Sequence, residues 1–249
     1  MKIARQEIVI SFEIDPSIVL SCGSAIQNMQ KKVGGQILSI NAPDDAPPSM
    51  PRVMLRLEDA IFNLGLDRIQ ITVVPPSQVT DKTEKSSKFT LQRISPLLTE
   101  ILPSVPKYCW AGVITEVEYH ENPLKSKSAN DAATPVFDKL ININRNNKDL
   151  SAFQLQYGIN DDLNFITYTI SAFEGRKIEL KPPQGSRFLV INPTEYPLTE
   201  CGVRVLLDIN NKPNKYNENP LNEIKDILSK TNFLVANIAE DLNLQGVMP

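Results

Sequence analysis

Residues 108–120 read YCWAGVITEVEYH, and this stretch sets the expectation for the whole fold. Val113, Thr115, Val117 and Tyr119 alternate with a set that is polar from Glu116 onward: Glu116, Glu118 and His120. Because successive side chains of a strand point to opposite faces, this strand has one apolar and one polar face. Such alternation is typical of an antiparallel sheet with one face on a core and the other toward water. The stretch therefore predicts a mainly antiparallel sheet, or two, with helices on one face.

Upstream of this strand, the sequence predicts an alternation of strands and helices. We expect a strand over 8–14, a helix over 16–32, a strand over 36–42 and a proline-rich loop over 43–51, then strands beginning at 53, 60 and 68. Residues 77–88 are polar and predict irregular structure. A helix is expected from Leu91 to Ile101, with Pro96 as its start or a kink.

Downstream, the pattern of strands and helices is similar but longer. We expect a loop over 122–133, a short helix that begins at Thr134 and Pro135, a hairpin over 153–173 with a turn after Phe173, and strands near 176–180, 187–192 and 202–209. Asn219 and Pro220 are typical of a helix start and predict a final helix.

The chain is thus predicted to have the α+β class, with two halves, 1–104 and 105–249. They form either two units or one continuous domain of 249 residues, a length that suits both arrangements. The order strand–helix–strand–meander–helix occurs in each half. This order predicts an internal duplication, with chance recurrence of common elements as the alternative.

Charge and residue counts argue against several classes of function. Lys and Arg number 26 against 29 Asp and Glu, so the basic excess typical of nucleic-acid binders is missing. No run of 18 apolar residues predicts a membrane span, and charges near Met1 are unlike a signal peptide. We expect a cytoplasmic protein that binds neither nucleic acid nor membrane.

Cysteine and histidine are scarce. Cys22, Cys109 and Cys201 have no spacing typical of zinc or redox sites, and we expect three buried, reduced thiols. His120 is the single histidine, which removes every site that needs two. We therefore expect no metal and no cofactor.

Glu116, Glu118 and His120 form the best catalytic candidate in the sequence. They share one face of a strand, about 7 Å apart from one to the next. Two carboxylates and an imidazole could serve acid–base chemistry or bind one divalent ion. The alternative is a solvated sheet face. A catalytic dyad of Cys109 with His120 is a further hypothesis, with a buried structural thiol as the alternative.

Three glycine or acidic patterns resemble known sites only superficially. Gly34-Gly35 follows a helix and predicts a helix end rather than a phosphate cradle. The loop from Asp208 to Asn219 lacks the glycine and glutamate that an EF-hand requires. None of the motifs GxxxxGK[ST], GxSxG and GxGxxG occurs.

The final helix carries an apolar seam at spacings of three and four residues, through Leu221, Ile224, Leu228, Thr231, Val235, Ile238 and Leu242. We expect this seam to pack on the protein's own sheet. Phe233 lies off the seam, and with the flanking Ile227 and Leu234 it is the predicted contact for a partner or a second copy.

The leading functional prediction is a non-catalytic interaction or assembly protein of a bacterium or phage, which binds another protein or itself. One alternative is a hydrolase-like enzyme that uses Glu116, Glu118 and His120. A second alternative is a module that binds a small molecule between the sheet and the helices.

Overall fold

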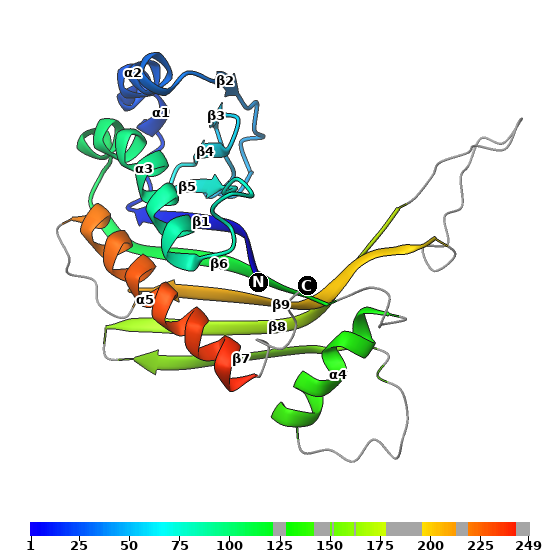
Figure 1. Ribbon diagram of the computed structural model, residues 1–249. Coiled ribbons are helices and arrows are strands. Elements are labelled where there is room, and N and C mark those ends of the chain that lie inside the picture. The colour runs from blue at the N-terminus through cyan, green and yellow to red at the C-terminus, as the bar shows by residue number, and fades with distance from the viewer. Residues whose placement is uncertain are drawn as a thin grey trace, which may run out of the picture.

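The computed structural model describes residues 1–121, 128–141, 150, 152–161, 163–177, 196–212 and 219–242. Within these residues, nine strands form one antiparallel sheet in the order β2-β3-β4-β5-β1-β6-β9-β8-β7 (Figure 1). The strands are β1 (Lys2–Phe12), β2 (Gln36–Ser39), β3 (Val53–Arg56), β4 (Ala60–Leu64), β5 (Arg68–Val73), β6 (Tyr108–Glu121), β7 (Gln154–Asp161), β8 (Asn164–Arg176) and β9 (Leu198–Asn210). The predicted α+β class is confirmed.

The helices are α1 (Ile18–Ser21), α2 (Gly23–Val33), α3 (Thr83–Ile101), α4 (Ala129–Leu140) and α5 (Pro220–Asp241), and a short 3₁₀ turn, η1 (Leu102–Ser104), follows α3. The predicted helix over 16–32 is thus two consecutive pieces. Gly34 and Gly35 have φ of 77° and 93° and end α2, as the sequence predicts. Asn219 caps α5 through a hydrogen bond from the backbone N–H of Leu221.

The hydrophobic core lies between the helices and one face of the sheet. In β6, Val113, Thr115 and Val117 have no exposed surface, and this face continues through Ile8 on β1 and Ile209 on β9, which pair with Val113. Buried side chains of α2, α3, α4 and α5 belong to the same apolar cluster. The described helices therefore cover one face, and we call the opposite face of the sheet the open face.

Alternating burial marks the open face along the sheet. Strands β4 and β5 alternate strictly between buried and half-buried residues, as does most of β9. The half-buried residues lie on the open face, and those near its centre include Glu7, Thr72, Ile114 and Leu206. Neighbouring side chains on this face cover one another in part, so these residues are only half-exposed to solvent.

Two helices begin earlier than the sequence predicts. Helix α3 includes residues 83–88 of the segment expected to be irregular, and Pro96 lies inside it. Its polar Ser86, Ser87 and Thr90 are buried because they are hydrogen-bonded, which apolar periodicity cannot reveal. Helix α4 begins at Ala129 rather than Thr134, because Ser128 and Asp131 form a capping box.

Other strand predictions differ at their ends. Strand β8 continues to Arg176, so the turn predicted after Phe173 is wrong, because pairing with β9 extends through Glu174 and Gly175. Strand β1 begins at Lys2, six residues before its predicted start. The strands predicted at 187–192 and over most of 176–180 lie outside the described residues.

The two halves share one sheet and one core. In each half the first strand pairs with the last: β1 with β5, and β6 with β9. Strands β1 and β6 then pair with each other across the middle of the sheet. The common pairing order leaves the duplication a prediction, since it is unaccompanied by residue-level similarity. No helix in the described part of the chain is long and apolar enough to cross a membrane.

Candidate functional site

Glu116, Glu118 and His120 project from β6 onto the open face, as the sequence predicts. Tyr119, between them, points to the core, where it is 3% exposed and its hydroxyl donates to the backbone oxygen of Val235 on α5. Glu116 and Glu118 are only 8% and 7% exposed. The expected solvated stripe is therefore a packed one, and its neighbours explain why.

Cations from the two flanking strands surround the carboxylates. Arg5 of β1 lies 2.6 Å from Glu116, and Arg204 of β9 lies 2.9 Å from the other oxygen of Glu116. Arg204 also donates to Glu118 at 2.8 Å, and Lys2 lies 3.7 Å from Glu118. Each buried carboxylate is thus balanced by at least two cations, which offsets its desolvation.

His120 completes this group, which we call the open-face ion cluster: Lys2, Arg5, Glu116, Glu118, His120 and Arg204. Its Nε2 lies 3.2 Å from Glu118, and its Nδ1 lies 3.7 Å from Glu200. The Nε2 contact has ion-pair distance without hydrogen-bond alignment. The His120 ring packs edge-on against the Phe173 ring, with 5.2 Å between the ring centroids. The guanidinium of Arg204 lies over the Phe173 ring, 5.2 Å from its centroid.

The open-face ion cluster links three neighbouring strands, β1, β6 and β9, through ion pairs between their side chains. General acid–base catalysis needs a carboxylate within reach of a substrate proton. Here the oxygens of Glu116 and Glu118 already contact Arg5, Arg204 and Lys2. Within the described residues, no group of three His, Cys, Asp or Glu side chains is arranged to hold a metal. The enzyme alternative remains a prediction that gains no support from this geometry.

Sequence reasoning found the three residues of β6 but missed Arg5 and Arg204. These arginines lie 111 and 86 residues away from their glutamate partners, Glu116 and Glu118. Only the register of β1 and β9 against β6 brings them together. Arg204 belongs to the strand predicted over 202–209, whereas Arg5 precedes the strand predicted over 8–14, and neither position specified a partner.

The hypothesis that Cys109 and His120 form a catalytic dyad is wrong. Both residues belong to β6, a single continuous strand of 14 residues. Eleven residues at about 3.3 Å each place them roughly 36 Å apart, at opposite ends of the strand.

Helix α5 presents one of the three predicted partner residues to solvent. Phe233 is 66% exposed on the side of the helix opposite the seam. Ile227 is 1% exposed and lies in the protein's own core, because it borders the seam. Leu234 is half-buried and packs against the same core. Phe233 is therefore an isolated apolar side chain, which is common on protein surfaces.

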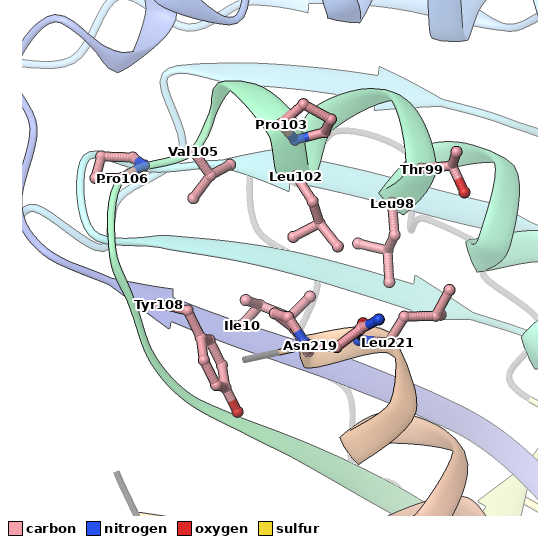
Figure 2. A pocket seen from close by; sticks show the side chains of 11 residues that line it. Ile10, Leu98, Thr99, Leu102, Pro103, Val105, Pro106, Tyr108, Asn219 and Leu221 are labelled. Carbon is pink, nitrogen blue, oxygen red and sulfur yellow. Dashed lines mark hydrogen bonds between the residues drawn. The ribbon is translucent and has the colours of Figure 1, made fainter. Parts of the chain in front are cut away.

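A pocket of about 470 Å³ lies between the two halves on the helix-covered side of the sheet. Figure 2 shows Leu98 and Leu102 on one side, and Ile10 of β1 beside Asn219 and Leu221 at the start of α5 on the other. Among the described residues, no charged side chain lines it; these lining residues are Ile10, Leu98, Thr99, Leu102, Pro103, Val105, Pro106, Tyr108, Asn219, Pro220 and Leu221.

Tyr108 is the aromatic polar group of this pocket. Its hydroxyl accepts a hydrogen bond from the Asn211 amide at 2.8 Å, and Asn211 also donates to Glu223 at 3.1 Å. Burial raises the pKa of Tyr108 to about 12. The hydroxyl therefore stays neutral even at alkaline pH, and the described lining, which is apolar or uncharged, suits an uncharged ligand.

Comparison with the models of known protein families gives no match, and comparison with curated proteins gives none either. What the protein does is therefore inferred from the open face, the surface of α5 and the pocket.

Proposed function

We propose that the protein is a non-catalytic interaction protein of a bacterium or phage, which works in the cytoplasm by binding another protein through its open face. The observation that carries this proposal is the position of the described helices, all on one face of a nine-stranded sheet. In the described part of the chain, the other face of the sheet is thereby left for contact.

The chemistry of the open face favours a partner with a mixed surface. Among the half-buried aliphatic side chains, Ile61 lies beside the uncharged Thr72, whereas Ile114 and Leu206 lie beside carboxylates. The charges of Glu116 and Glu118 at one end are balanced within the open-face ion cluster, whereas Glu7 and Asp208 near the centre accept hydrogen bonds from Gln70 and Asn210. Protein interfaces combine apolar contact with hydrogen bonds in this way, whereas nucleic-acid interfaces depend on a basic excess.

Ile114→Lys tests this proposal with little risk to folding. Ile114 is half-buried at the centre of the open face, and its cross-strand neighbours are Glu7 and Asp208, which accommodate a cation. The matched control is Phe233→Asp, on the opposite side of the molecule.

We expect the tagged chain, purified from its source cells, to retain a stoichiometric protein partner that Ile114→Lys loses and Phe233→Asp keeps. Binding of the purified partner to both variants, measured by calorimetry, then gives the loss directly. A partner lost with Phe233→Asp and kept with Ile114→Lys would transfer the function to α5. The absence of any partner of the wild-type chain would contradict the proposal.

A second candidate function, the binding of a small uncharged molecule, is favoured by the pocket. A ligand at 100 times its Kd stabilises a protein by about 2.7 kcal/mol, so a thermal-shift screen with neutral aromatic and aliphatic compounds detects it. Leu221→Trp, at the half-buried wall of the pocket, should abolish any shift by filling the space. A shift that survives this substitution would place the ligand elsewhere.

A further inference from the structure

Among the strands that the structure describes, β7 is the longer of the two edges of the sheet. It has eight residues, and all of them except Leu155 are exposed. The other edge, β2, has only four residues. Natural proteins protect edge strands by shortness, proline or charged side chains, especially lysine. Strand β7 contains none of these protections apart from Asp161 at its end.

The outward backbone groups of β7 are identified by its register with β8. The N–H of Ala172 donates to the carbonyl of Phe153, its partner in the continuing register of the β7–β8 pair. In an antiparallel pair such hydrogen-bonded positions alternate with positions whose groups point away. Odd-numbered residues of β7 therefore bond to β8, and the backbone groups of the four even-numbered ones, Gln154, Gln156, Gly158 and Asn160, point outward.

The side chains of β7 add an apolar row to this edge. Leu155, Tyr157 and Ile159 pair with buried residues of β8 and so lie on the helix-covered face. Tyr157 stacks on Tyr168 at 4.9 Å but remains 40% exposed, and Ile159 is 46% exposed. The core of the protein thus reaches the edge of the sheet without being closed there.

We propose that β7 pairs antiparallel with β7 of a second copy of the chain, which joins two nine-stranded sheets through a two-fold axis at Tyr157. In this register Tyr157 faces the partner's Tyr157, and Leu155 faces the partner's Ile159. The outward groups of Gln156 and Gly158 then bond to the partner's Gly158 and Gln156. All three apolar side chains gain apolar partners from β7 itself.

A second copy is the occupant because the edge complements itself. The ladder from Gln154 to Asn160 contains no charged residue, so two copies do not repel each other. Isologous two-fold pairing is also the commonest symmetry of soluble oligomers. This inference concerns the edge, not the open face, and it stands or falls independently of the proposed function.

A charge introduced at Tyr157 tests both the pairing of the two strands and its register. The full chain should have twice the chain mass in light scattering, and the apparent dissociation constant should follow from dilution. Tyr157→Lys and Tyr157→Glu should each weaken the dimer about tenfold or more, since like charges then face each other across the axis. An equimolar mixture of the two variants should restore it.

Two further variants separate the pairing from folding. Gln156→Pro removes an outward N–H and leaves the bonds to β8, so it should give a folded monomer, whereas Gln156→Thr should remain a dimer. A wild-type chain that is monomeric at high concentration would overturn the inference. So would a dimer that tolerates both charged variants and Gln156→Pro, because its interface would then lie elsewhere.

Discussion

The three cysteines have different surroundings, although the sequence predicts the same state for all of them. Cys22 and Cys201 are completely buried, whereas Cys109 is half-exposed at the start of β6. The prediction of three buried thiols is therefore wrong for Cys109, which lies where the register of β6 with β1 shifts, between the pairs Ser11–Trp110 and Phe12–Tyr108. None of the three forms a disulfide.

Thiol labelling of the native protein should consequently modify one cysteine. We expect Cys109 to react with a water-soluble thiol reagent at neutral pH, and the two buried cysteines to react only after unfolding. Cys109→Ser should remove the native reaction while the total after unfolding falls by one thiol. Rapid native labelling of Cys22 or Cys201, located by peptide mass analysis, would show that the core opens readily.

Stability at alkaline pH should depend on Cys22. Burial, with a smaller contribution from Asp15, raises the pKa of its thiol from 9.0 to about 11. A group whose pKa is raised in the folded state stabilises the fold fully below its unfolded pKa and loses this effect as the pH rises. Denaturant titrations should therefore show a loss of stability from pH 9 to 11 that is smaller in Cys22→Ala. Equal slopes for both proteins would contradict this assignment.

At the scale of elements, α5 shows which parts of a helix can be predicted. Its seam is buried as expected from Ile224 to Leu242, with Leu228 1% exposed, whereas Leu221 at its start is half-buried. Figure 1 shows the helix crossing the sheet toward β7, where Lys230 pairs with Asp161. The side chain of Thr231 is satisfied by the carbonyl of Ile227, so its place in the seam is tolerated.

Two substitutions on α5 should differ greatly in how far they change the free energy of unfolding. Leu228→Ala should lower the free energy of unfolding by about 2–5 kcal/mol, because it removes packed methylenes and leaves a cavity. Phe233→Asp should change the same free energy by less than about 0.5 kcal/mol, as is usual for exposed sites. Urea unfolding followed by circular dichroism measures both. A large effect of Phe233→Asp would mean that another part of the chain covers this side of the helix.

At the scale of the whole molecule, a buried polar network joins the two halves. Gln6 of β1 has no exposed surface, and it contacts Thr90 of α3 at 2.7 Å and Thr115 of β6 at 3.2 Å. Ser87 of α3 donates to Asn232 of α5 at 2.8 Å. Both halves therefore contribute side chains to this network, which specifies how α3 and α5 lie against the central strands.

Gln6→Ala should be far more costly than the same substitution at Gln70. Removal of Gln6 leaves Thr90 and Thr115 buried without this partner, at about 1–3 kcal/mol for each unsatisfied group. Gln70 is half-buried on the open face and donates to Glu7, so we expect an effect within about 0.5 kcal/mol. Chemical unfolding should show one transition for both. Similar values for the two variants would indicate that the network adds no stability.

Local patterns in the sequence determined the strands, the final helix and the face on which Glu116, Glu118 and His120 lie, because alternation and helical spacing depend only on neighbouring residues. Only the tertiary structure decided that β1 and β9 flank β6, which brings Arg5 and Arg204 to those carboxylates. It also decided that β7 is an edge and that Gln6 meets Thr90. Strand order and register connect residues about a hundred positions apart, and the local pattern of a single chain carries no record of such pairings.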